Sequence, residues 1–138
     1  MSASAIATPR PTADRAGLLR TTLRGNGVVS IVSGAAILAA ASNAAAIGEV
    51  PPLSLALLGG FTLVGGCAML AMAADRRFIR AFGLAVLAVD LLWVAASVFI
   101  LLSGWPVLTP LGFWAVALLA DVVLVMIALE VVGLRRLN

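Results

Sequence analysis

Long apolar runs, separated by short polar or turn segments, dominate the chain. Four of these runs reach the length of about 20 residues that an α-helix needs to cross the hydrocarbon core of a bilayer. They extend approximately over residues 27–47, 53–74, 78–103 and 111–134. This pattern predicts an all-α polytopic membrane protein, in which four transmembrane helices form a four-helix bundle made of two helical hairpins.

A basic leader, residues 1–24, precedes the predicted transmembrane domain of residues 25–138. Residues 1–11 combine small residues, Thr and two prolines, so they are expected to be disordered. Residues 12–24 mix Leu with Arg, which fits either an interfacial helix or an unstructured basic segment. The Ala-rich end of the first run also resembles the cleavage region of a secretory signal peptide. The length of the basic leader favours a retained span over that alternative.

The arginines predict the orientation of the helices. All nine basic residues are Arg, and each of them flanks a predicted span on the same side of the membrane. Because Lys and Arg near span ends are retained in the cytoplasm, both termini are expected to be cytoplasmic. The nine residues are Arg10, Arg15, Arg20, Arg24, Arg76, Arg77, Arg80, Arg135 and Arg136.

Composition supports a membrane protein and excludes several kinds of chemistry. Hydrophobic residues make up 63% of the chain and charged residues 11%, whereas about a quarter of a soluble domain is charged. The net charge of +3 comes from arginines that flank the spans, so nucleic acid is not an expected partner. The absence of His and Lys excludes an imidazole base, a typical zinc site and a Schiff base. We therefore expect no enzymatic activity, no cofactor and no metal.

Small residues at helical spacing favour close packing of the helices. In the first run Ser30 and Gly34 are four residues apart, and in the second run Gly59 and Gly66 lie within one narrow arc. Small residues on one face let helix backbones approach in lipid, where no hydrophobic force drives helices together. Besides the lipid bilayer, the expected partners are further copies of the chain in a homo-oligomer, or another membrane protein.

Two acidic residues, Asp90 and Asp121, fall near the middle of the third and fourth predicted spans. An ionised carboxylate at that depth costs at least about 2.5 kcal/mol on insertion scales, so both are expected to face protein, water or each other. If the two carboxyl groups approach one another, a shared proton would relieve their repulsion.

A stripe of small and polar residues runs along the third span. Gly83, Asp90, Ser97 and Gly104 recur every seven residues, so this stripe is predicted to face the bundle interior. Trp93 lies on its flank. We therefore take Asp90, Asp121, Trp93 and Ser97 as a candidate proton or ligand site. The alternative is structural: protonated Asp side chains hydrogen-bond across helices and hold the bundle or an oligomer together.

The remaining polar residues lie toward the cytoplasmic side. Asn26, Ser30 and Ser33 occupy a narrow arc in the cytoplasmic half of the first span. Glu130 follows Asp121 by nine positions, which places it on the opposite face of the fourth helix and close to the cytoplasmic boundary. There it is expected to reach the interface and pair with arginines. The candidate anchoring residues are Arg76, Arg77, Arg80, Glu130, Arg135 and Arg136.

Several segments carry a resemblance to known proteins: the Arg-rich leader, the Ala-rich first run, Asp75-Arg76-Arg77, Asp90-Leu91-Leu92-Trp93 and Leu134-Arg135-Arg136. With them the chain resembles small uncharacterised four-span proteins of bacterial inner membranes, a resemblance that implies no activity but implies a location in the bacterial cytoplasmic membrane. The architecture is also loosely similar to small multidrug-resistance transporters. Their membrane carboxylate belongs to the first helix, whereas the first span here has no acidic residue, which argues against that family.

Three functions are compatible with these features. The leading hypothesis is a nonenzymatic accessory or interaction protein of the cytoplasmic membrane, because the loops are short and the helices have small-residue faces. The second is a proton-coupled transporter of a small or lipophilic solute that uses the midplane carboxylates. The third is a lipophilic-ligand-binding protein or an enzyme, in which Asp90 and Trp93 would contact the ligand.

Overall fold

A computed structural model describes residues 16–75 and 77–137 of the chain. It contains four α-helices and one short 3-10 helix, and no strand among the described residues. These elements are α1 (Gly17–Ala41), η1 (Ala44–Ala46), α2 (Pro52–Met72), α3 (Ile79–Ser103) and α4 (Pro110–Arg135). Each of the four α-helices is long and apolar enough to cross a membrane, which confirms the predicted all-α, four-span architecture.

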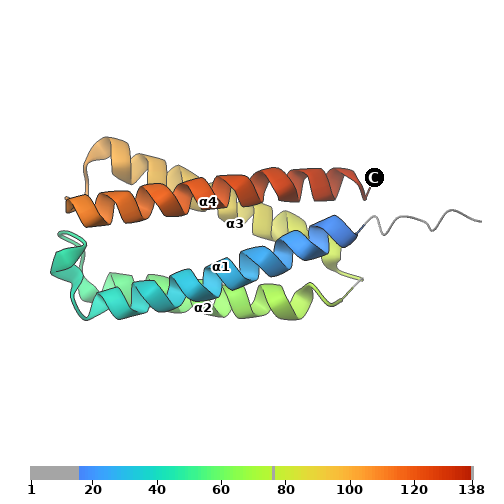
Figure 1. Ribbon diagram of the computed structural model, residues 1–138, viewed down its shortest axis with the longest axis horizontal. Coiled ribbons are helices and arrows are strands. Elements are labelled where there is room, and N and C mark those ends of the chain that lie inside the picture. Colours follow the sequence, from blue (N-terminus) through green and yellow to red (C-terminus); the bar gives the residue numbers. More distant parts are fainter. Residues whose placement is uncertain (1–15, 76, 138) are drawn as a thin grey trace, which may run out of the picture.

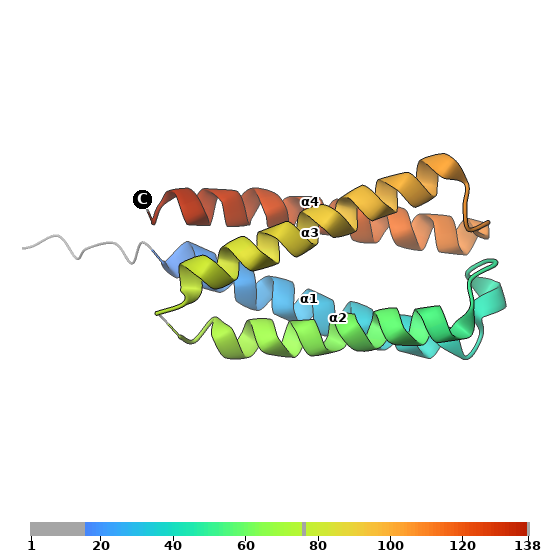
Figure 2. The same cartoon turned by 180° about the vertical axis from the view of Figure 1, so that it is seen from behind.

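The helices form two antiparallel hairpins that lie in two layers (Figure 1). α1 packs along α2, α3 packs against α4, and α1 also contacts α4 across the layers. α2 makes no extensive contact with α3 or α4. Seen from behind, α3 crosses the bundle diagonally, from the end where it follows α2 to the end where it leads into α4 (Figure 2). The helices therefore pack tightly between α1 and α2 and loosely between α2 and α3.

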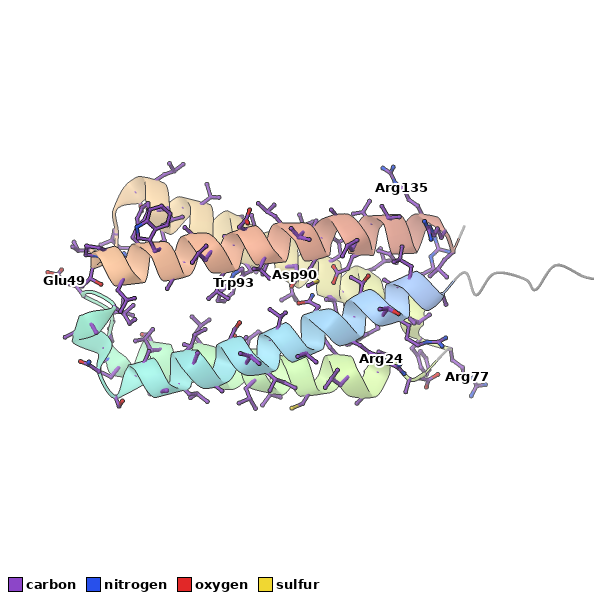
Figure 3. All side chains as sticks on the ribbon, viewed as in Figure 1. Arg24, Glu49, Arg77, Asp90, Trp93 and Arg135 are labelled. Atoms are coloured by element: carbon purple, nitrogen blue, oxygen red, sulfur yellow. The ribbon has the colours of Figure 1, made fainter. Side chains whose placement is uncertain are left out.

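The two ends of the bundle differ in composition. Arg24, Arg77 and Arg135 lie at one end, and Glu49 lies at the other (Figure 3). We call the first the arginine end. The second, where the α1–α2 and α3–α4 connections contain Pro51, Pro52, Pro106 and Pro110, we call the proline end.

Local sequence explains where the helices at the proline end begin and stop. Pro52 and Pro110 are the first residues of α2 and α4, a position where the missing N–H costs nothing. The Thr109 hydroxyl caps α4 by accepting a hydrogen bond from the Gly112 N–H at 3.1 Å. α3 ends at Ser103, and the next residue, Gly104, has a φ of 68°, the left-handed conformation typical of a helix C-terminus.

The first helix begins earlier than the apolar run predicted. Residues 17–24, assigned to the basic leader, form the first two turns of α1 and are continuous with the membrane-spanning part. Leu19 and Leu23 in these turns are completely buried in a cluster with side chains of α2, α3 and α4. They are therefore neither an unstructured segment nor a separate interfacial helix. The disorder expected for residues 1–11 lies outside the described residues.

Two pairs of glycines hold α1 against α2. Gly27 faces Gly66 and Gly34 faces Gly59, and a Cβ built on Gly34 would lie 2.6 Å from the backbone N of Leu63. A Cβ on Gly66 would lie 2.7 Å from the carbonyl oxygen of Gly27. The two backbones are thus in direct contact, as the small-residue spacing predicted.

The two hairpins are tied to each other at the proline end. The Thr109 backbone N–H donates to the carbonyl of Ile47 at 2.9 Å, and the Glu49 N–H donates to the carbonyl of Val107 at 2.8 Å. The Thr109 hydroxyl also donates to the carbonyl of Ala46 at 2.6 Å. These bonds fix the connection after α1 against the connection that leads into α4.

Candidate functional site

A buried polar cluster joins three helices inside the bundle. The side-chain amide of Asn26 in α1 donates to Asp90 Oδ2 in α3 at 2.6 Å and to Glu130 Oε1 in α4 at 3.0 Å. Asn26 is 2% exposed, Asp90 6% and Glu130 0%. One neutral amide group therefore bridges two carboxyl groups that are 40 residues apart in sequence and belong to different helices.

Each member reaches the cluster because it lies on the buried face of its helix. In α3 the buried residues include Gly83, Asp90 and Ser97, which confirms that the stripe faces the interior over these three positions. Its fourth predicted member, Gly104, follows the end of α3 and is exposed. In α4 the buried face includes Val123 and Glu130, seven residues or about two turns apart. The helical period thus selects the carboxyl groups that enter the bundle.

The hydrogen bonds satisfy this cluster only in part. An amide nitrogen has two hydrogens, and here each carboxyl group receives one of them. Glu130 Oε2 is buried and has no hydrogen-bond partner among the described residues. An unsatisfied polar group in an apolar interior costs free energy. The hydrogen bond from Asn26 is therefore important for keeping the Glu130 side chain in this buried position.

A cavity of about 220 Å³ lies beside the cluster and is lined by all four helices. Asp90 and Trp93 are located between the two layers of the bundle (Figure 3), and both line this cavity together with Asn26. Most other lining groups are apolar or aromatic, and the additional polar ones are Ser30, Ser33 and Thr62. The cavity therefore combines an apolar wall with a small number of polar groups.

The cavity lies where the bundle is most loosely packed. Most of its lining comes from α2 and α3, two helices that make no extensive contact with each other. Phe61 of α2 and Val89 of α3 line the cavity and are 69% and 46% exposed, so the cavity reaches the surface between these two helices. In a membrane this opening between α2 and α3 faces the acyl chains.

The structure does not bring together all the residues of the candidate site. Asp90 and Trp93 share the cavity, whereas Asp121 is exposed on the outer surface of α4 and belongs to neither the cavity nor the polar cluster. The contact between Asp90 and Asp121 that we considered is therefore not formed. Ser97 is buried, but its hydroxyl donates to the backbone carbonyl of Trp93 at 2.9 Å and does not line the cavity.

Glu130 occupies a different environment from the one expected. Instead of reaching the interface to pair with arginines, its side chain is completely buried and accepts a hydrogen bond from Asn26. The helical offset from Asp121 is as predicted, and the two residues lie on opposite faces of α4. The error concerns which of these faces is turned inward, because the face with Asp121 is the exposed one.

The described arginines among the candidate anchoring residues are exposed near the arginine end. Arg80 and Arg135 line a second cavity of about 210 Å³ between α3 and α4, together with apolar side chains such as Leu84 and Leu87. Arg77 and Arg136 are exposed as well, and Arg76 lies outside the described residues. An anchoring role for these residues stays a prediction.

Asn26 is the member of the site that sequence reasoning did not connect to the acidic residues. Its signal was the narrow arc of Asn26, Ser30 and Ser33, all three of which line the cavity. The arc indicates that this face of α1 is turned toward something polar, but it does not indicate which helix supplies the partner. Glu130 was similarly visible in the sequence and placed in the wrong environment.

The fold and the site together define an integral membrane protein with four helical spans, a buried polar cluster and an adjacent cavity. Comparison of the chain with protein-family models, with curated proteins and with solved structures finds no match. The functional argument consequently depends on the geometry of this site.

Proposed function

We propose that the protein binds a small lipophilic solute within the membrane, in the cavity between its hairpins. The observation that carries this proposal is the cavity of about 220 Å³, whose wall is mainly apolar and aromatic and includes a few polar side chains. Sites for small molecules have this composition, because apolar surface supplies affinity and a few polar groups orient the ligand. The opening between α2 and α3 suits a solute that arrives from the bilayer rather than from water.

Asp90 belongs both to the wall of the cavity and to the hydrogen-bonded cluster that joins α1, α3 and α4. It lines the cavity and also accepts a hydrogen bond from Asn26, which in turn contacts Glu130. A solute that changes the hydrogen bonding of Asp90 therefore acts on a contact among α1, α3 and α4. This arrangement supports a carrier that exchanges protons at these carboxyl groups as an extension of simple binding.

Two glycine positions of α2 provide a matched test. Gly65 lines the cavity, Gly60 does not, and a Cβ at either position meets no atom within 4 Å. Gly65→Leu is expected to fill the cavity, while Gly60→Leu leaves it open. Both changes add a similar helix propensity, so they differ mainly in cavity volume.

Trp93 serves as the reporter of cavity occupancy. Replacing the exposed Trp105 and Trp114 by Phe leaves Trp93 as the single Trp in the chain. In lipid nanodiscs, the neutral probe 1-bromo-4-neopentylbenzene is expected to quench Trp93 saturably, because bromine quenches indole on contact. Gly65→Leu should weaken this quenching at least about tenfold and Gly60→Leu by less than about twofold, the first corresponding to about 1.4 kcal/mol. Equal quenching in both variants would contradict solute binding in the cavity.

A second candidate function, an accessory or interaction protein, is favoured by the position of Asp121. This side chain is exposed near the middle of α4, on a surface that also carries the 63% exposed Trp114. A carboxyl group facing acyl chains is costly, so a partner helix covering it would be favourable. Purification in mild detergent with crosslinking tests this function. A homo-oligomer or a copurifying membrane protein that Asp121→Leu disrupts supports it, and a monomer without any partner contradicts it.

We further propose that the arginine end faces the cytoplasm of a bacterial cell and that the protein resides in its cytoplasmic membrane. The support is the gathering of arginines near one end of the spans. In a Cys67→Ala background, a membrane-impermeant maleimide applied to intact cells should label Glu49→Cys. It should label Asp75→Cys only after lysis. The reverse labelling pattern would overturn this orientation.

A further inference from the structure

We propose that the solute held in the cavity is a lipophilic organic cation, whose charge lies against Asp90 and whose apolar part lies among the aromatic and aliphatic walls. This inference rests on the proposed function and adds to it the charge and chemical class of the ligand. It draws on the acidic residue in the wall, the aromatic side chains around it and the position of the opening.

The carboxyl group of Asp90 gives the cavity its charge preference. Asp90 is almost entirely buried, yet it lines the cavity, and the described lining residues include no basic side chain. A carboxylate in an apolar, membrane-embedded wall favours an opposite charge, because water is not present to solvate it. An anionic solute would instead be repelled at short range.

The aromatic side chains favour an organic cation over a hydrated metal ion. Trp93 follows Asp90 by three residues and so lies on the adjacent turn of α3, and Phe61 and Phe82 also contribute to the lining. Aromatic faces attract cations through their quadrupole, and this attraction is strongest for a desolvated charge such as a quaternary ammonium. An alkali or alkaline-earth ion would require a shell of oxygen ligands that an apolar wall does not provide.

The polar groups beside Asp90 have limited capacity to bind a strongly hydrogen-bonding solute. The Asn26 amide already donates to Asp90 and Glu130, and the Thr62 hydroxyl donates to the backbone carbonyl of Leu58 at 2.8 Å. The polar lining that remains consists of the Ser30 and Ser33 hydroxyls and the buried Trp93 Nε1–H, which has no hydrogen-bond partner among the described residues. These few groups cannot replace the hydrogen bonds to water that a ligand with many donors and acceptors would lose here. A compact cation with an apolar surface fits these walls and enters from the bilayer through the opening at Phe61.

The test uses two probes of the same shape that differ in charge. (4-Bromobenzyl)trimethylammonium carries a positive nitrogen where 1-bromo-4-neopentylbenzene has a carbon atom. Both are titrated against the chain with Trp93 as its single Trp, in nanodiscs of zwitterionic lipid. The variants are Asp90→Asn, which removes the charge at nearly constant volume, and Asp121→Asn, a matched control that removes a carboxyl group from the outer surface of α4.

Asp90→Asn is expected to weaken quenching by the cation at least tenfold and quenching by the neutral probe less than twofold. Asp121→Asn should leave both unchanged. Retained binding of the neutral probe also shows that the cavity of the Asp90→Asn variant is intact, and Asp90→Glu should keep most of the preference for the cation. The inference is overturned if Asp90→Asn weakens quenching by both probes equally or by neither. It is also overturned if Asp121→Asn weakens quenching by the cation as much as Asp90→Asn does.

The two proposals fail in distinguishable ways. If Gly65→Leu blocks the neutral probe while Asp90→Asn has no selective effect on the cation, the cavity binds a lipophilic solute and the charge assignment is wrong. If Gly65→Leu blocks neither probe, both the solute-binding function and the cation assignment are contradicted.

Discussion

In the α1–α2 hairpin the two backbones touch at glycines, whereas in the α3–α4 hairpin two glycines face a side chain of α1. Gly34 and Gly59 meet directly within the first hairpin. In the second hairpin Gly83 and Gly133 instead face Leu19 of α1. The helices of the first hairpin are thus packed directly against each other. In the second hairpin, the space beside Gly83 and Gly133 is occupied by the Leu19 side chain of the first.

The difference between the hairpins places polar chemistry between them rather than within either one. Contact between glycine backbones leaves no room for functional side chains along the α1–α2 seam. The polar cluster of Asn26, Asp90 and Glu130 lies where α1 meets α3 and α4, and the cavity lies beside it. A tightly packed hairpin therefore acts as a support against which the more loosely packed helices can hold a site.

The largest effect on this arrangement is expected from Gly34→Val. A Cβ at Gly34 would lie 2.6 Å from the Leu63 backbone N and 2.8 Å from the Gly59 carbonyl, so α1 and α2 must separate. We expect a loss of roughly 3 kcal/mol of unfolding free energy, measured by SDS titration in mixed micelles with circular dichroism. The control Gly60→Val places its Cβ in open space. Similar losses in the two variants would show that the glycine contact does not hold the hairpin.

A smaller effect is expected from Asn26→Leu, which breaks the connection between the hairpins. The substitution leaves the carboxyl oxygens of Asp90 and Glu130 without their donor in a buried position, at a cost of about 2 kcal/mol. Asn43→Leu, in the exposed turn after α1, is the control and should cost little. In a double-mutant cycle, Asn26→Leu combined with Glu130→Leu should lose less than the sum of the single variants. Strict additivity would argue against the contact.

The smallest effect is expected from Thr109→Val at the proline end. The variant loses the cap of α4 and the hydroxyl bond to the Ala46 carbonyl, a combined cost of about 1 kcal/mol. Thr62→Val is the matched control, because the Thr62 hydroxyl donates to the Leu58 carbonyl in the preceding turn of its own helix. The same SDS titration ranks the two, and an equal or greater loss in Thr62→Val would contradict a role for Thr109 in joining the hairpins.

Much of the fold is predictable from the sequence. Of the four predicted site residues, Asp90 and Trp93 line the cavity. The helix number and the hairpin arrangement follow from apolar runs of membrane-spanning length. The burial of Asp90 follows from its position in the seven-residue stripe with Gly83 and Ser97. The early start of α1 was missed, because Leu19 and Leu23 stand among arginines that suggest solvent, although the tertiary structure buries both leucines.

What the sequence by itself determined is the relation of residues within each helix. The helical period places Asp121 and Glu130 on opposite faces of α4, whatever surrounds them. Only the tertiary structure decided that the face with Glu130 turns inward and meets Asn26, while Asp121 faces outward. The reason is physical. Each of the two faces is apolar apart from one acidic residue, so the sequence of α4 does not decide which face is buried. That depends on how Leu19 and Asn26 of α1 pack against this helix.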